Sequence, residues 1–305
     1  MTDIAQPAAA GLAAFRGYTL EAEAVTEEFL DARLGPEQAF ALLSQPADGA
    51  PSDGWILCPS IGQEHGNLRR LEASVARALA RQGAAALRIR PDVGPDGTLA
   101  GMDLDTRITE VLDGASVLRE RGIAPAGVFG AVSGAIVAFL VCEDLAVDSL
   151  VAVEPVRRGR QYVRESLRRQ AVTDLMSADD ADALSPLRQL ETDGVTWVRG
   201  VRLTQTAYQR IAAVDVLDAV RGFRGRALLM GVSPAGTVSR TLLALEKHLR
   251  SLGGSPTVEV IDDRLPVPLG EYHYENAGPI RHDTRIDLDR RLTDRTTDWV
   301  AADRP

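Results

Sequence analysis

A mostly parallel β-sheet with helices on both faces is the α/β fold class that this sequence of 305 residues predicts. Short apolar runs alternate with amphipathic segments along most of the chain, a pattern typical of repeated strand–helix–strand units. The alternation stops for one polar stretch and then resumes, which indicates an insertion into a single α/β domain. We expect a flexible tail over 1–12, an α/β core over 13–156 and 223–305, and a helical cap insertion over 157–222.

The first half of the chain predicts a hairpin and then two strand–helix units. Two strand-like segments, 25–34 and 38–46, are separated by the turn pair Gly35-Pro36 and predict an antiparallel pair. Apolar residues then recur every three or four positions in two segments that follow short apolar runs. The elements expected there are a strand at 54–60, a helix at 67–83, a strand at 84–92 and a helix at 105–122.

The second half continues the alternation on either side of the insertion. The segment 133–145 is apolar nearly all round, so we expect a helix that is fully buried. The insertion predicts mostly helices with one short extended piece. The other expected elements are strands at 126–132, 148–156, 225–233 and 257–263, a helix at 237–254 and a terminal helix.

The charge and the motif inventory exclude several function classes. A formal net charge of −9 and a pI near 5.1 oppose binding to nucleic acid or to an anionic membrane surface. We therefore expect a small-molecule or peptide-derived substrate as partner, with a homodimer left open. No phosphate-binding loop, dinucleotide fingerprint or zinc-ligand spacing occurs, so neither a cofactor nor a metal is predicted. The start of the chain does not resemble a secretory signal, so a cytoplasmic location is expected. Cys58 and Cys142 lie in apolar runs and should behave as small buried hydrophobes.

The segment "VFGAVSGAIVA", residues 128–138, nearly matches the Gly-x-Ser-x-Gly nucleophile elbow of serine hydrolases. The residue midway between Gly130 and Gly134 is Val132, and Ser133 comes one position late. We favour the register with Val132 at the bend. Because a β-branched residue suits positive φ badly, this register predicts a relaxed turn. The other register places Ser133 at the bend between two alanines, and a capping serine is the structural alternative.

The order of these elements resembles the α/β-hydrolase fold. Within it, the chain resembles the hydrolases associated with exosortase systems and the serine aminopeptidase-like hydrolases. Two stretches carry the likeness: "GQEHGNLRR" at 62–70, with its Gly-x-Glu and following arginine, and "LVAVEPVRRGRQYVRE" at 150–165. The hydrolases associated with exosortase systems often lack the elbow serine, so the resemblance implies that an elbow without a serine is typical of this group.

The resemblance implies a serine, an acid and a histidine at defined places. Ser133 would be the nucleophile. No acidic residue occurs in 231–239, where the acid usually lies, so Glu154 at the end of the strand after the bend is the candidate acid. His273, after the last strand, is the candidate base, with His282 as a second choice. A surface or structural role is the alternative for both histidines.

The loop after the first parallel strand, "PSIGQEHGN" at 59–67, should face the bend and supply an oxyanion amide. Glu64 and His65 are further candidates for proton transfer there, although Glu64 could instead pair with an arginine for structural reasons. An arginine-rich run begins at Arg157, where guanidinium groups could bind a carboxylate or phosphate or simply form a solvated helix face. The expected substrate-binding residues are Ser60, Gln63, Val132, Arg157, Arg160 and Tyr162.

Three functions remain open at this point. The favoured one is a non-hydrolytic enzyme of epimerase, lyase or cyclase type, in which Glu64, His65 or Glu154 transfers a proton. The second is a serine esterase, thioesterase or peptidase using Ser133, Glu154 and His273. The third is a binding protein without catalysis. The fold cannot separate them, because function depends on the site.

Overall fold

The computed structural model describes residues 17–37, 39–91, 101–177, 185–263, 269 and 279–302, and the predicted tail at 1–12 lies outside them. The strands are β1 (Gly17–Leu20), β2 (Val25–Leu34), β3 (Ala39–Pro46), β4 (Gly54–Cys58), β5 (Ala85–Arg90), β6 (Pro125–Ala131), β7 (Ser149–Val153), β8 (Val195–Val198), β9 (Val201–Thr204), β10 (Arg226–Val232) and β11 (Ser255–Ile261). The helices are η2 (Glu21–Glu23), α1 (Glu64–Arg81), α2 (Leu104–Glu120), α3 (Ser133–Val141), α4 (Gly159–Ser177), α5 (Pro186–Asp193), α6 (Gln205–Ala212), α7 (Val216–Ala219), α8 (Arg240–Ser251) and α9 (Pro279–Ala301).

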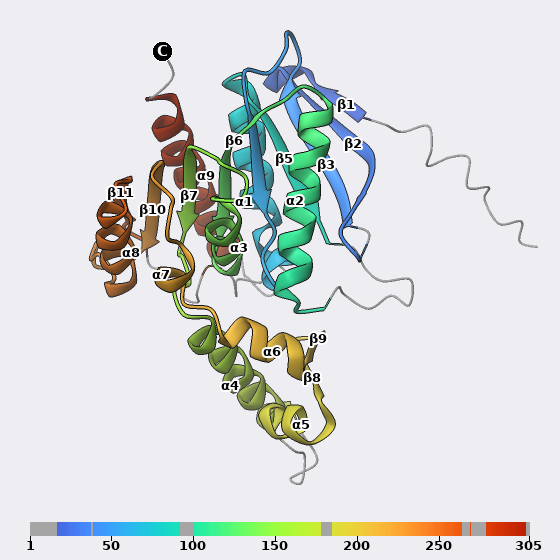
Figure 1. Ribbon diagram of the computed structural model, residues 1–305, viewed down its shortest axis with the longest axis vertical. Helices are drawn as coiled ribbons and strands as arrows, with labels where there is room; N and C mark the ends of the chain where they lie inside the picture. Colours follow the sequence, from blue (N-terminus) through green and yellow to red (C-terminus); the bar gives the residue numbers. More distant parts are fainter. Residues whose placement is uncertain are drawn as a thin grey trace, which may run out of the picture.

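The central sheet has the order β1-β2-β3-β5-β4-β6-β7-β10-β11 (Figure 1). In this sheet, β5, β4, β6, β7, β10 and β11 are parallel to one another. Strands β1, β2 and β3 pair antiparallel, and β3 pairs antiparallel with β5. The expected hairpin and the expected parallel strands are thus confirmed. Strand β1 was not predicted, since its four residues are too short to show a period.

Helices cover both faces of the sheet, as the alternation predicts. Helices α1 and α9 pack on one face against Trp55, Leu57 and Phe129. Helices α2, α3 and α8 pack on the other, against side chains such as Ile56 and Val128 that alternate with the first set. Every residue of α3 but Leu140 is buried, which confirms the expectation from its apolar sequence.

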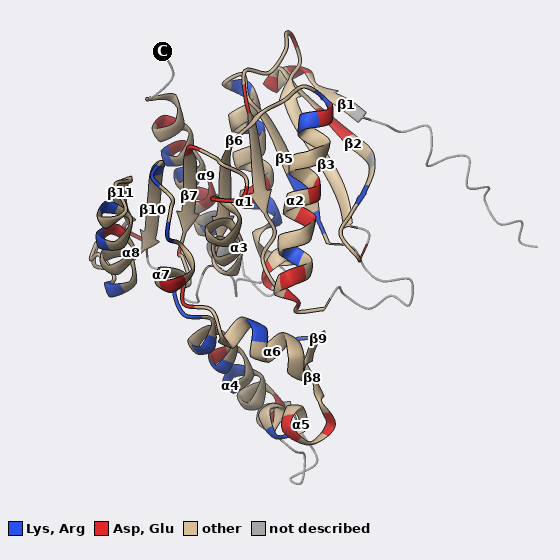
Figure 2. Cartoon of the chain, in the orientation of Figure 1, with Lys and Arg blue, Asp and Glu red and all other residues tan. Residues whose placement is uncertain are grey.

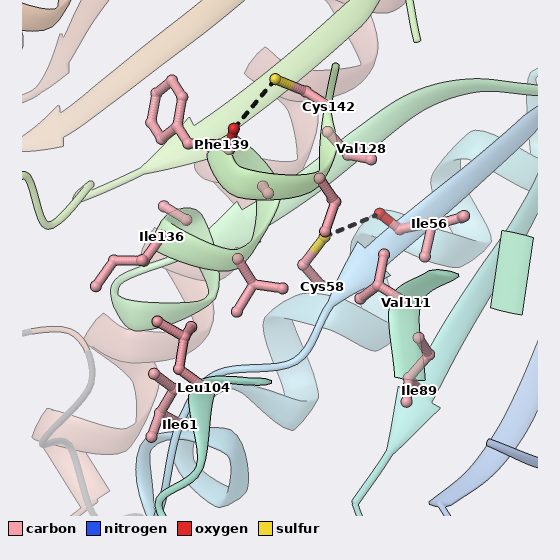
Figure 3. Packing of buried hydrophobic residues seen from close by; sticks show 14 of the residues in the cluster. Ile56, Cys58, Ile61, Ile89, Leu104, Val111, Val128, Ile136, Phe139 and Cys142 are labelled. Carbon is pink, nitrogen blue, oxygen red and sulfur yellow. Dashed lines mark hydrogen bonds between the residues drawn. The ribbon is translucent and has the colours of Figure 1, made fainter. Parts of the chain in front are cut away.

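The two cysteines lie in the core on the α3 side of the sheet. Figure 3 shows Cys58 and Cys142 among Ile56, Val128 and Phe139, with each thiol directed at a backbone carbonyl. Both cysteines are free and buried, as expected. Burial raises the pKa of the Cys142 thiol to about 12, so neither the surroundings nor the protonation state favours reactivity.

The segment between β7 and β10 lies beyond one end of the sheet (Figure 1). It contains α4 to α7, and the single extended piece expected from the sequence is instead the antiparallel hairpin β8–β9. The connecting residues, Arg199 and Gly200, have φ of 51° and 77°, as two-residue hairpin turns require. Figure 2 shows basic residues along α4. Among the described residues, no helix has the length and apolar character needed to cross a membrane.

Candidate active site

The bend between β6 and α3 brings three chain segments into close contact. A Cβ added to Gly130 would lie 2.4 Å from the carbonyl oxygen of Gly134, and one added to Gly134 would lie 2.6 Å from the carbonyl oxygen of Cys58. Any side chain at either position would force the strand and helix apart. The spacing of the two glycines therefore reflects backbone packing.

Val132 is the residue at this bend with positive φ, at φ 52° and ψ −114°. The expectation of a relaxed turn is wrong, because Val132 keeps a conformation that disfavours β-branched residues. Its N–H donates to the carbonyl of Val153 at 2.8 Å, and the buried helix α3 begins at the next residue. These contacts hold the turn against the local preference of valine.

Ser133 and Ser60 connect the bend to the loop after β4. The Ser133 hydroxyl is fully buried; it accepts a hydrogen bond from Ile61 N at 2.9 Å and donates to Glu64 Oε2 at 2.5 Å. The Ser60 hydroxyl is also buried; it donates to the carbonyl of Ala131 at 2.8 Å and accepts from Gly134 N at 3.3 Å. Neither serine is among the described residues that line the cavities of this region.

Glu64 lies at the first position of α1, which begins three residues earlier than predicted. Its carboxylate accepts hydrogen bonds from the Ser133 hydroxyl and from Ser133 N at 3.4 Å. Burial raises the pKa of Glu64 to about 7, against the opposing effects of the Ser133 hydrogen bonds, of Tyr162 on α4 and of Arg169. Close to neutral pH, both its acidic and its basic forms are therefore populated.

Glu64 faces a cavity of about 780 Å³ between the sheet and α4. The described residues that line it are Glu64, Val132, Glu154, Pro155, Val156, Arg157, Arg158, Gln161, Tyr162, Glu165, Ser166, Arg169, Arg240, Thr241 and Leu269. Apart from Leu269, they come from the start of α1, the residues that follow β6 and β7, α4 and the start of α8. The cavity thus opens at the carboxyl ends of parallel strands, where α/β sheets commonly bind ligands.

Glu154 is the second acid in this cavity. It follows β7 with φ of 48°, and its carboxylate accepts a hydrogen bond from Val232 N at 2.5 Å. Burial raises the pKa of this carboxyl above its ordinary value. The cavity therefore contains two carboxyl groups with raised pKa values.

A side pocket of about 40 Å³ shares Glu64, Tyr162, Ser166 and Arg169 with the larger cavity. The side chains that complete it are Ile61, Gln63, Met102, Val198 and Arg199. It thus lies between the loop after β4 and the β8–β9 turn. Gln63 was expected at the site, whereas Arg199 was not. A glycine following an arginine between two strand-like stretches, "VTWVRGVRLT", is the signal that could have predicted this turn.

Backbone strain concentrates at these two cavities. Five described residues other than glycine have positive φ, and three of them, Val132, Glu154 and Arg199, line the cavities. Such conformations cost free energy and are enriched at functional sites. This distribution supports the assignment of the region as the functional site.

The arginines of the insertion divide into two groups. Arg157 lines the large cavity, and its Nε and Nη2 both donate to the carboxylate of Asp215 at 3.2 Å. Arg160 does not line this cavity; it contributes with Arg164 to a separate groove between α4 and α6. The structure therefore moves Arg160 away from the expected binding site.

Of the histidines, His65 lies in α1, directly after Glu64. It is buried, neither ring nitrogen has a hydrogen-bond partner among the described residues, and Nδ1 is 3.9 Å from Glu72 Oε1. Burial, together with Arg90, Arg107 and Arg69, holds the pKa of His65 well below its ordinary range. His65 is not among the described residues lining the cavities. His273 lies outside the described residues, as does the side chain of His282.

Comparisons with known proteins identify the architecture. No protein-family model matches the chain. The curated protein sequences give no match either. Solved structures do: an esterase from the archaeon Pyrobaculum calidifontis is 14% identical with a TM-score of 0.55 over 90% of this chain and 85% of its own. Est1E from Butyrivibrio proteoclasticus is 14% identical with a TM-score of 0.55, over 90% of this chain and 99% of its own. The esterase domain of a Rhodothermus marinus protein is 18% identical with a TM-score of 0.54, over 90% of this chain and 98% of its own.

Within the described residues, no group of three or more His, Cys, Asp or Glu side chains is arranged to hold a metal ion. The cavities are lined by carboxyl, phenol, amide and guanidinium groups beside a strained strand-to-helix bend. Together with the sheet order and the structural similarities, this arrangement shows that the chain has the α/β-hydrolase fold.

Proposed function

We propose that this protein is a non-hydrolytic enzyme that transfers protons to and from carbon, with Glu64 as the base. Its substrate is a small or peptide-derived molecule, and its reaction is of epimerase, lyase or cyclase type. The observation that carries this proposal is the position of the Glu64 carboxylate: it lines the same cavity as Val132 and accepts a hydrogen bond from the Ser133 N–H.

Ester hydrolysis on this fold needs a nucleophile at the bend and two free amides for the oxyanion. Val132 offers only an isopropyl group. The amide of the residue after it, Ser133, donates to Glu64, and the amide of Ile61 in the facing loop donates to the Ser133 hydroxyl. An oxyanion formed here would meet a carboxylate where a hydrolase provides donors, so the site disfavours the transition state of acyl transfer.

Proton transfer suits the same groups. A pKa of about 7 gives Glu64 a useful population of carboxylate together with appreciable basicity near neutral pH. When the C–H bond next to a substrate carbonyl breaks, the proton moves to Glu64 and the electron pair stays on the substrate, delocalised into that carbonyl. Return of a proton to the other side of the carbon inverts it, whereas departure of a neighbouring leaving group gives elimination. Glu154, the other carboxyl in the cavity, is the candidate for the second proton.

The test compares hydrogen exchange with serine labelling on the same preparation. The wild-type protein is incubated in D₂O with a panel of N-acetyl amino acids and dipeptides, and deuterium incorporation at Cα is followed by mass spectrometry. In parallel it is treated with a fluorophosphonate probe, which labels activated serines.

We expect deuterium incorporation, no labelling, and a loss of less than about tenfold in Ser133→Ala, since that change removes one hydrogen bond to Glu64. Labelling that disappears in Ser133→Ala would instead establish the serine hydrolase. Neither labelling nor exchange on any member of the panel would favour a binding protein without catalysis.

A further inference from the structure

We propose that the groove between α4 and α6 binds a small phosphate monoester through Arg160 and Arg164. The groove has a volume of about 240 Å³, and the described residues that line it are Arg160, Arg164, Tyr208, Gln209, Ala212 and Ala213. It shares no described lining residue with the large cavity beside Glu64. This inference is therefore independent of the proposed reaction.

The first argument is that these two arginines lack a carboxylate partner. Segment 157–169 contains six arginines and one glutamate, in a chain whose net charge is −9. Four of the six form ion pairs with one of two carboxylates, Asp215 or Glu165. Arg160 and Arg164 are the other two; both are exposed, and neither side chain has an ion pair or a hydrogen bond within the described part of the chain. Two positive charges therefore lie together without a counter-charge from the protein.

The second argument is that both arginines occupy positions that are unfavourable for α4 itself. Arg160 is the second residue of the helix, where the positive end of the helix dipole disfavours a cation. Arg164 follows one turn later on the same side, so the two like charges repel each other. Local helix stability thus opposes this pair, whereas a bound anion would compensate both charges.

The third argument is the chemistry of the groove walls. Both guanidinium groups, the Tyr208 hydroxyl and the Gln209 amide can donate hydrogen bonds, and no acidic side chain is among the described residues that line the groove. Tyr208 and Ala212 also pack against the hydrophobic core, so their side chains are held in place. The groove therefore offers donors for an anion together with an apolar surface for a small group attached to it.

The fourth argument is that backbone contacts fix the spacing of the two helices, which lie side by side (Figure 1). A Cβ added to Gly159 would lie 1.9 Å from the carbonyl oxygen of Ile211, and the Gly159 N–H donates to the carbonyl of Val214 at 2.9 Å. Any side chain at position 159 would push α4 away from α6. Because the groove is already formed, an anion would bind without the cost of ordering it.

A phosphate monoester is the anion that matches these features. Near neutral pH it carries almost two negative charges on three acceptor oxygens, as two guanidinium groups require, whereas a carboxylate carries one charge. A volume of about 240 Å³ also leaves room for a small group on the ester oxygen. The net charge of −9 opposes approach to nucleic acid or to an anionic membrane, so we assign the groove to a small soluble ester.

The experiment measures the binding of phenyl phosphate and of benzenesulfonate, which carries a single negative charge on a similar frame. Both are titrated by saturation-transfer NMR at about pH 7.5 and about 0.15 M ionic strength. Arg160→Gln and Arg164→Gln change the groove. Arg168→Gln is the matched control, because Arg168 lies on the same helix outside the groove and pairs with Glu165. Arg157→Gln removes a guanidinium group that lines the large cavity and so reports binding there.

We expect phenyl phosphate to bind with a Kd of about 1 mM and benzenesulfonate at least about tenfold more weakly. Arg160→Gln and Arg164→Gln should each weaken phenyl phosphate binding about tenfold. Both should also melt at or above the wild-type temperature, since each removes a repulsion within α4, which separates loss of charge from loss of folding. Arg168→Gln and Arg157→Gln should keep the affinity within about twofold.

Three results would overturn the proposal: equal affinity for the two probes, no saturable binding of phenyl phosphate, or full affinity in both Arg160→Gln and Arg164→Gln. Binding that is lost in Arg157→Gln but kept in the two groove variants would place the phosphate in the large cavity and reject the groove. Vesicles of phosphatidylcholine and phosphatidic acid test the other source of this chemistry. We expect no co-sedimentation; co-sedimentation that Arg160→Gln abolishes would assign the groove to a lipid headgroup and reject a soluble ester.

Discussion

Helix α1 carries two glutamates whose pKa values burial raises to about 7, and only one of them has the surroundings of a catalytic group. Glu64, at the start of the helix, faces the large cavity, which Tyr162 also lines, and accepts hydrogen bonds from Ser133. Glu72, about two turns later, is 4% exposed and lies beside His65, and the charges of Arg90, Arg88 and Arg69 oppose the rise of its pKa. A shifted pKa thus marks burial at both positions, and access to a cavity is what distinguishes a base from a structural carboxyl.

The largest expected effect concerns how far ionised Glu72 lowers the free energy of unfolding. A carboxyl whose pKa is about 7 in the folded protein and 4.5 when exposed holds its proton more tightly in the folded state between those two values. The free energy of unfolding therefore falls as pH rises from about 4.5 to about 7 and stays lower above that. Glu72→Gln should remove the part of this dependence that Glu72 contributes and gain up to about 3 kcal/mol at pH 8, with little gain at pH 4.

Denaturant unfolding at both pH values measures this difference. A loss of stability at pH 8 would mean that the ionised Glu72 is stabilised by the arginines near it. Glu64 and Glu72 would then differ in charge state as well as in access to the large cavity.

A smaller effect is expected at His65. Because both ring nitrogens are buried without hydrogen-bond partners among the described residues, His65→Leu should raise the free energy of unfolding by about 1 kcal/mol at pH 8. Thermal and denaturant melts of the variant measure it. Destabilisation by a similar amount would indicate that His65 and Glu72 form a productive pair.

The smallest effect is expected at Tyr162. Tyr162 lines the same cavity as Glu64, and its hydroxyl lowers the pKa of that carboxyl, so Tyr162→Phe should raise the pKa of Glu64 by less than about one unit. The titration of the Glu64 side-chain carbon, followed by NMR in protein labelled at glutamate, reports this shift. A lower pKa in the variant would show that water entering the cavity outweighs the loss of the hydroxyl.

Much of the fold could be predicted because it depends on local periodicity. The hairpin, the strand–helix alternation and the buried helix α3 all follow from the spacing of apolar residues and from turn residues such as Gly35. The β8–β9 hairpin was missed since its strands have four residues each, too few to separate from the helices around them. The start of α1 was placed three residues too late because the apolar period that predicts the helix begins only at Leu68.

The site could be predicted only in part. Chain order located Glu64, Glu154, Gln63, Val132, Arg157 and Tyr162 near the cavity, since strand ends and the loop after β4 meet at one edge of the sheet. The shape of the bend could not be predicted, because contacts from Val153 override the conformational preference of Val132. The burial of His65 and the approach of Arg199 depend on tertiary packing that no local pattern in the sequence encodes.

Deuterium exchange at the substrate Cα in Glu64→Gln and Glu72→Gln, measured from pH 5 to pH 9, tests most directly whether Glu64 is the base. The wild-type rate should rise with pH through a midpoint near 7, as the carboxyl loses its proton. Glu64→Gln should lose at least about 100-fold of the rate, while Glu72→Gln keeps it within about twofold with the same midpoint, because it lies outside the cavity. Equal losses in both variants, or a rate in Glu64→Gln that matches the wild type, would contradict the account.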